Sequence, residues 1–232
     1  MGVKKAKPIR KNTELAQQST LEVAKEWAAK NTGAAIGVAL AVVVAAMLLG
    51  GYFVYESSSL ERARAAYGLI AARLPGEGAD NAAEWNKVIP DLRRFIAGYG
   101  NSAPTLDAKM NLARGYFETG SYALAVETWQ EALKAVSSDS SLKPLILYQL
   151  GYGCQAAGKP EEALKAWAEL RRLKSPALER EADWNLGRIY QEKKELAKAV
   201  EMFALASQAP GEYPPGPQID ERLAAIKIAK AK

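Results

Sequence analysis

The sequence contains no histidine and only one cysteine, Cys154. Without histidine, the chain cannot form a Ser-His-Asp or Cys-His triad, a His-ligated zinc site or a His-ligated haem site. A single cysteine excludes an intramolecular disulfide, a CxxC redox pair and a Cys-only zinc site. Missing disulfides are common in cytosolic proteins and also in small periplasmic helical domains, so they do not assign a compartment. We therefore expect no metal and no other cofactor.

Basic charge is present only in small excess. The 232 residues include 31 Lys and Arg against 26 Asp and Glu, a net charge of +5. Proteins that bind nucleic acid concentrate basic residues in a denser patch, so we do not expect nucleic acid among the partners. The carboxylates show no pairing that suggests acid–base catalysis, and Gly151-x-Gly153 is too short for a dinucleotide fingerprint. We predict a protein that is not an enzyme.

A largely apolar run of 23 residues, from Gly33 to Tyr55, contains no charged residue. As a helix it would be about 34 Å long, enough to cross a hydrocarbon core of about 30 Å. Trp27 precedes the run, and Tyr52 and Phe53 lie at its far end, where aromatic side chains meet the two headgroup layers. The run is longer than the apolar part of a signal peptide, and no small-x-small cleavage site follows it. We therefore predict an uncleaved membrane-spanning helix.

The distribution of charge around this helix predicts its orientation. Residues 1–30 contain seven basic and three acidic residues, whereas the chain from Glu56 onward contains 24 basic and 23 acidic residues. Because basic residues accumulate on the cytoplasmic side, the N-terminus is expected in the cytoplasm and the C-terminal part outside it. The predicted parts are a basic tail with a juxtamembrane helix (1–32), a transmembrane helix (33–55) and a repeat domain (56–232).

Four small residues recur at every fourth position of the predicted membrane helix. Such a stripe lets a second helix approach closely. Gly and Ala are also common in membrane helices that make no such contact, so both interpretations stay open. The predicted contact residues are Gly33, Gly37, Ala41 and Ala45.

The remainder of the chain repeats one pattern three times. Each copy has Leu followed by a small residue, then an aromatic residue or Cys, and nine residues later Ala-x3-aromatic. This is the tetratricopeptide pattern, in which each repeat is a pair of antiparallel helices, A and B. The matching residues are, copy by copy, Leu112, Ala113, Tyr116, Ala125 and Trp129; Leu150, Gly151, Cys154, Ala163 and Trp167; and Leu186, Gly187, Tyr190, Ala199 and Phe203.

The chemistry of this pattern is packing. Small residues let helix A approach helix B closely, and the aromatic residues of helix B fill the space toward the neighbouring pair. Cys154 stands where the pattern has Tyr, so we predict a core residue rather than a reactive thiol. Gly120 and Gly158 fit the turn between helices A and B, and Lys194 takes that place in the third copy.

The segments at the two ends of the array complete the predicted fold. Residues 57–74 and 82–97 are expected to form a degenerate first repeat, in which Pro90 should kink or split the second helix. Residues Ile219–Lys230 are expected to form the helix that caps the last repeat. The fold class is all-α, with one N-terminal transmembrane helix followed by a tetratricopeptide-like α-solenoid with a C-terminal capping helix.

Helix A lines the concave surface in arrays of this kind, so its residues beside the small position are candidates for a partner-binding groove. Residues four apart, such as Trp184 and Arg188, share one face. Amides can bond a peptide backbone, and Arg can pair with carboxylates through two parallel bonds. Ordinary packing between repeats is the alternative interpretation. The predicted groove residues are Met110, Asn111, Arg114, Tyr148, Gln149, Tyr152, Trp184, Asn185 and Arg188.

The junction between the N-terminal tail and the membrane helix points to a family. The segment Glu22-Val23-x-Lys25-x-Trp27-x3-Asn31 leads directly into a Gly/Ala/Val-rich membrane helix, and irregular tetratricopeptide-like repeats follow. This arrangement resembles the YfgM-like family of ancillary SecYEG translocon subunits. The resemblance implies a single-pass protein of the bacterial inner (cytoplasmic) membrane with a periplasmic repeat domain. It also implies protein partners, namely the Sec translocon and a periplasmic chaperone or exported clients.

A scaffold for another cell-envelope complex, in secretion, division or outer-membrane assembly, is the alternative function. Division coordinators and outer-membrane assembly lipoproteins have similar repeats, but they carry a cleaved signal or a lipidated Cys, and this sequence has neither feature. The sequence does not predict the oligomeric state.

The charge difference across residues 33–55 leads to a topology prediction. A reporter that is active only outside the cytoplasm should be active when fused after Lys232, because the basic residues retain the N-terminus in the cytoplasm. A cytoplasmic reporter at the same position is the matched control and should be inactive. Cytoplasmic activity of that fusion would reverse the predicted orientation.

Overall fold

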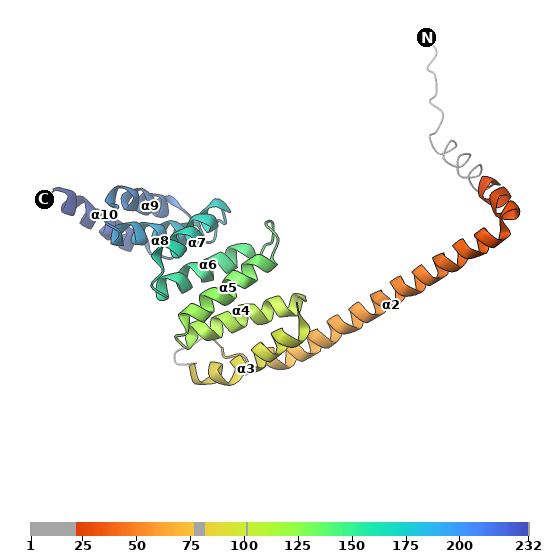
Figure 1. Ribbon diagram of the computed structural model, residues 1–232. Helices are drawn as coiled ribbons and strands as arrows, with labels where there is room; N and C mark the ends of the chain where they lie inside the picture. Colours follow the sequence, from red (N-terminus) through yellow and green to blue (C-terminus); the bar gives the residue numbers. More distant parts are fainter. Residues whose placement is uncertain (1–21, 77–81, 101, 232) are drawn as a thin grey trace, which may run out of the picture. The chain divides into compact units, whose positions relative to one another are not determined.

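The computed structural model describes residues 22–76, 82–100 and 102–231 (Figure 1). Within these residues every regular element is an α-helix, which confirms the predicted fold class. The chain divides into two compact units, Met1–Ser59 and Leu60–Lys232.

The first unit contains the apolar helix. Residues 22–30 are helical, and helix α2 extends from Thr32 to Ala71. The most apolar part of α2 has a mean hydropathy of 2.5 and contains no buried residue. It is therefore long and apolar enough to cross a membrane, and it does not serve as the core helix of a folded domain. Residues 1–21 of the predicted basic tail and juxtamembrane helix lie outside the described residues.

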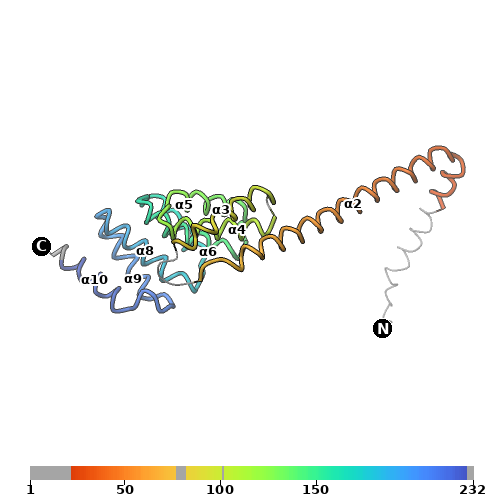
Figure 2. Tube along the Cα trace, turned by 90° about the horizontal axis from the view of Figure 1, so that it is seen from below, coloured from red at the N-terminus to blue at the C-terminus, as the bar shows by residue number. Residues whose placement is uncertain are grey.

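The second unit is a succession of antiparallel helices in which each helix packs against the next (Figures 1 and 2). It begins with the last turns of α2, which continue beyond Tyr55 as a helix, and with α3 (Ala82–Tyr99). Three regular helix pairs and a final helix follow. Their bounds are α4 Ala103–Glu118, α5 Tyr122–Ala135, α6 Lys143–Ala156, α7 Pro160–Arg172, α8 Glu179–Glu192, α9 Leu196–Gln208 and α10 Gly216–Ala231.

The pairs are held together by aromatic rings that lie against glycine backbone. A Cβ atom added at Gly187 would lie 2.6 Å from Phe203 Cδ1, and one added at Gly151 would overlap the ring of Trp167. The close approach of helix A to helix B at these glycines is as the sequence pattern predicted. The rings of Trp167 and Phe203, however, lie against helix A of their own pair, where the pattern had predicted that they fill the space toward the neighbouring pair. Trp129 makes a second kind of contact, because its ring lies against Gly153 of the next A helix. Each glycine therefore allows an approach that any larger residue would prevent.

The turns between the two helices of each repeat have left-handed backbone. The φ angles are +76° at Gly120, +69° at Gly158 and +62° at Lys194. Glycine adopts this conformation without steric cost, whereas a residue with a Cβ atom does so at a cost of about 1–2 kcal/mol. The three turns predicted from the repeat pattern are thus confirmed, including the one that lacks glycine.

The first repeat is formed by the end of α2 and by α3. Trp85, Leu92 and Phe95 of α3 are buried in one cluster with Ala63 and Ile70 of α2. Of the two outcomes predicted for Pro90, the split does not occur, because α3 continues through Pro90 to Tyr99. The kink stays a prediction. The buried face of α3 explains why the helix tolerates Pro90, since packing compensates for the hydrogen bond that proline cannot donate.

The predicted cap is present as α10. It begins at Gly216, slightly earlier than predicted, with Pro217 in its first turn, where the missing N–H has no intrahelical partner in any case. Ile219 and Ile226 of α10 are buried in the cluster that contains Phe203 of the last repeat. The last repeat thus buries its apolar face beneath α10.

Gly151 offers a test of this packing. Gly151→Ala should destabilise the repeats by about 1–3 kcal/mol, because the new methyl group overlaps the buried Trp167 ring, and this overpacking outweighs the better helix propensity of Ala. Gly68→Ala is the matched control. Gly68 also lies inside a helix but has no atom within 4 Å of the added Cβ, so the change should stabilise by up to about 1 kcal/mol. Urea unfolding followed by tryptophan fluorescence measures both; equal effects would refute the packing argument.

Candidate protein-binding face

The predicted groove residues occupy the three A helices of the regular repeats. Met110, Asn111 and Arg114 lie on α4, Tyr148, Gln149 and Tyr152 on α6, and Trp184, Asn185 and Arg188 on α8. We call the side of α4, α6 and α8 that carries them the A-helix face. The structure joins some of these residues in hydrogen-bonded groups and buries others in the core.

A polar group, the Tyr–Glu181 cluster, links α6 to α8. The hydroxyl groups of Tyr148 and Tyr152 both donate to Glu181 Oε1, the former over 3.0 Å. The Asn185 amide donates to the Tyr152 hydroxyl over 3.3 Å and accepts a hydrogen bond of 3.2 Å from Gln155 Nε2. Two predicted tyrosines and the predicted Asn185 therefore belong to one network. Glu181 and Gln155 were not predicted, although Glu181 lies one helical turn before Asn185.

Burial and the carboxylate of Glu181 both raise the pKa values of the tyrosines in this cluster. The pKa of Tyr148 is raised to about 12 by burial first, and then by the negative charge of Glu181 and the hydrogen bond to it. The same two causes raise the pKa of Tyr152 still further. Both phenols therefore stay neutral over the physiological range and remain hydrogen-bond donors.

A similar link joins α2 to α4. Asn111 Nδ2 donates to the Tyr67 hydroxyl over 2.7 Å and to the Asp107 carbonyl over 3.0 Å. Asn111 and Asn185 occupy equivalent positions in their repeats, and each bonds a tyrosine of the preceding A helix. Between α4 and α6 the described side chains form no such bond. The middle of the A-helix face, between α4 and α6, is therefore less tied than its two ends: neighbouring A helices are joined there by fewer side-chain hydrogen bonds.

Two predicted groove residues lie below the surface. Trp184 is 3% exposed and its ring centroid is 5.1 Å from that of Phe203, and Asn185 is fully buried. The indole of Trp184 therefore packs in the core, and Asn185 serves the Tyr–Glu181 cluster. Their side chains leave little surface for a partner in this conformation.

The other predicted residues are at least partly accessible. Met110 packs partly against the core, and Gln149 is half-buried. The guanidinium carbon of Arg114 lies 5.8 Å from the Trp85 ring centroid, and its Nε lies 3.9 Å from Glu118. Arg188 is half-buried at the C-terminal half of α8.

Sequence reasoning missed the most exposed apolar residue of this region. The side chain of Leu145 is 44% exposed on α6. It precedes Tyr148 and Gln149 by three and four positions and so shares their helix face. This spacing could have identified it, but the repeat pattern specifies only the packed positions. Leu145 therefore provides an exposed apolar side chain in the middle of the A-helix face.

Two charged residues at the start of helix A form ion pairs with a neighbouring B helix. Lys109 and Asp183 occupy positions that are usually apolar; Lys109 Nζ lies 3.2 Å from Glu131, and the buried Asp183 lies 2.5 Å from Arg171 Nε. Burial raises the pKa of Asp183, and the charge of Arg171 partly offsets this effect. Each charge at the packed position is therefore compensated by the neighbouring B helix.

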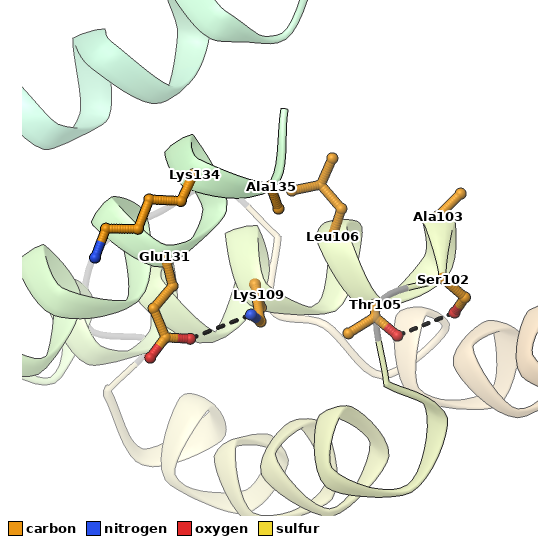
Figure 3. A pocket seen from close by; sticks show the side chains of 8 residues that line it. All are labelled: Ser102, Ala103, Thr105, Leu106, Lys109, Glu131, Lys134 and Ala135. Carbon is orange, nitrogen blue, oxygen red and sulfur yellow. Dashed lines mark hydrogen bonds and ion pairs between the residues drawn. The ribbon is translucent and has the colours of Figure 1, made fainter. Parts of the chain in front are cut away.

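Lys109 and Glu131 also line a cavity of about 460 Å³ where α4 begins and α5 ends (Figure 3). The hydroxyl groups of Ser102 and Thr105 bond each other over 3.0 Å on its other side. Its polar groups are thus largely paired among themselves, and it contains none of the predicted groove residues.

Neither a metal site nor a reactive thiol is found in the described part of the chain. No group of three or more Cys, Asp or Glu side chains there could hold a metal ion. Cys154 is buried, and burial raises the pKa of its thiol to about 11, so the nucleophilic thiolate is scarce at neutral pH.

Comparisons with known proteins agree with this architecture. The sequence matches the tetratricopeptide repeat-like domain family over residues 25–228. The fold is similar to that of a Podospora anserina putative kinesin light chain with nearly identical TPR-like repeats, at 18% identity and a TM-score of 0.56, covering 74% of this chain and 88% of that one. It is also similar to MamA from Desulfovibrio magneticus RS-1, at 14% identity and a TM-score of 0.56, covering 75% and 86%. At these identities the likeness concerns the fold alone. A comparison with curated proteins gives no match.

The raised phenol pKa of Tyr148 predicts a dependence on alkaline pH. A folded-state pKa of about 12 exceeds the unfolded value of 10.0, so this contribution to stability is present below pH 10 and is lost as the pH rises toward 12. Tyr148→Phe should therefore make the free energy of unfolding fall less steeply in this window. Urea unfolding at several pH values, followed by circular dichroism, measures it, with the exposed Tyr122→Phe as control. A slope equal to that of the unmodified chain would contradict the assignment.

Proposed function

Because this chain belongs to the tetratricopeptide repeat-like domain family, a family of typically non-catalytic repeats that includes YfgM-like proteins, we propose that it is a membrane-anchored scaffold. It binds other proteins through the A-helix face and carries out no reaction of its own. We further propose that it is an accessory subunit of the Sec translocon, which it links to periplasmic chaperones or exported clients.

The A-helix face carries the binding part of this proposal. It combines the exposed Leu145, the half-buried Tyr148 and Tyr152 and the half-buried Arg188 on neighbouring helices. Tyr and Arg dominate the binding energy of many interfaces, because they join a large contact area to a polar group. The single observation that supports this function best is that the middle of the face has an exposed apolar side chain, Leu145, and few side-chain hydrogen bonds between its helices.

The apolar part of α2 supports anchoring in a membrane. It contains no buried residue, so its apolar side chains find no cover within the protein. Gly33 and Gly37 have no atom within 4 Å of an added Cβ, which leaves the predicted stripe with Ala41 and Ala45 open to another helix. We propose that this stripe contacts a membrane helix of the translocon, with the N-terminus in the cytoplasm and the repeats in the periplasm of the inner membrane.

The link to the Sec translocon rests on the segment before and inside the membrane helix. Residues 22–30 are helical and carry Trp27 at the expected headgroup level. This segment and the repeats together resemble YfgM-like translocon subunits, whereas the repeats alone are shared by many scaffolds.

Crosslinking in native membranes tests the proposal. A photo-reactive amino acid at Leu145 should capture a periplasmic protein, because this side chain is exposed on the A-helix face. The same amino acid at Lys165, exposed on the B helix α7, is the matched control and should capture much less. Equal capture at the two positions would refute the A-helix face as the binding surface.

The membrane contact is tested separately. Gly37→Leu should reduce co-purification of the translocon at least about fivefold, since a bulky side chain prevents close approach of a second helix, while the Leu145 adduct persists. Ala39→Leu, which adds the same side chain on the opposite side of the helix, is the control. If the unmodified chain co-purifies with a division or outer-membrane complex instead, the translocon assignment is wrong.

A further inference from the structure

A small cleft opens between the last A helix and the cap. It has a volume of about 290 Å³ and is lined by Arg188, Gln191 and Glu192 of α8 and by Arg222 of α10. Two guanidinium groups from helices that are distant in sequence thus face one space.

The fold places both arginines by helix spacing. Arg188 follows Glu181 and Asn185 by seven and three positions, so it continues the stripe of α8 that carries the Tyr–Glu181 cluster. Arg222 lies between the buried Ile219 and Ile226, three positions after one and four before the other, on the side of α10 that packs against the last repeat. Burial of the two isoleucines therefore fixes the backbone from which Arg222 extends.

The cleft has an excess of positive charge, because two guanidinium groups and one carboxylate line it. Over the part of the chain that the structure describes, neither Arg188 nor Arg222 has a carboxylate oxygen within 4 Å, whereas Arg73, Arg94 and Arg171 each do. Glu192 lines the same cleft without forming an ion pair. A free guanidinium group has a planar fork of donors that fits a carboxylate through two parallel bonds.

We infer that the Arg188–Arg222 cleft binds a carboxylate of the polypeptide that the A-helix face holds, so the bound segment is acidic. This inference rests on the proposed function. It follows from the continuity of the cleft with the A-helix face, since Arg188 belongs to both. A bound carboxylate accepts hydrogen bonds from both arginines, and Gln191 can donate a further bond to it. Glu192 opposes a second negative group, which limits the site to one carboxylate.

Fluorescence anisotropy with the full-length chain in detergent tests the inference. The probes are short labelled peptides of alternating Ala and Leu that end in Glu-Glu with a free terminus, in Glu-Glu amide, or in Gln-Gln amide. The Glu-Glu peptides should bind about tenfold more tightly than the Gln-Gln amide, a difference typical of a charge-assisted pair. Preference for the free terminus identifies the terminal carboxylate as the ligand, and equal binding of the two Glu-Glu peptides identifies a side-chain carboxylate.

Substitutions connect this preference to the cleft. Arg188→Gln and Arg222→Gln should each remove most of the tenfold preference, because Gln keeps much of the side chain but not the charged fork. Arg172→Gln, at the exposed end of α7 and outside the cleft, is the matched control and should leave the preference within about twofold. Circular dichroism verifies that each variant is folded.

Three results would overturn the inference: equal affinity for all three peptides, an equal loss in the Arg172→Gln control, or displacement of the peptide by inorganic phosphate at the peptide's own concentration. The last result would make the cleft a site for small anions. These outcomes differ from failure of the proposed function, which would appear as equal photo-crosslinking from Leu145 and Lys165. Crosslinking from Leu145 without any preference for acidic peptides would refute the carboxylate site alone.

Discussion

The contact between aromatic rings and glycine backbone is the constraint on which the repeat array depends. Trp167 on Gly151 and Phe203 on Gly187 set the distance between the two helices of a repeat, and Trp129 on Gly153 sets the distance to the next repeat. Because protein interiors are close-packed, these distances leave little freedom to the helix angles. The A helices then stand side by side, and their accessible residues form one face.

The polar groups of that face are not equally available along its length, because some of them are already hydrogen-bonded to one another. Asn111 with Tyr67, and Asn185 with Tyr152, tie neighbouring A helices at the two ends. Polar groups bonded to one another in this way offer less to a partner, since breaking their bonds has a cost. Two exposed or half-buried groups remain available beside these bonds: Leu145 in the middle, and Arg188, which has no carboxylate oxygen within 4 Å among the described residues. An apolar contact beside a cationic cleft suits an amphipathic, acidic segment.

The two units of the chain differ in where their apolar side chains are buried. The repeats bury their aromatic residues against each other and beneath α10, whereas the apolar part of α2 buries nothing within the protein. A membrane provides the missing apolar surroundings for such a helix. The proposed scaffold therefore combines one contact surface in the membrane with another on the A-helix face.

The sequence by itself determined the all-α class, the apolar helix, the three repeats, their turns and the cap, because each of these follows from local spacing and residue size. It predicted a kink or a split at Pro90, and the helix is not split there, because the buried face of α3 compensates for the missing hydrogen bond. Helix spacing also gave Tyr148, Tyr152 and Arg188 as groove candidates, but it could not separate them from Trp184 and Asn185, which tertiary packing buries. Only the tertiary structure brought Glu181 to the tyrosines and Arg222 to Arg188, because such pairs join helices whose separation in sequence carries no signal of contact.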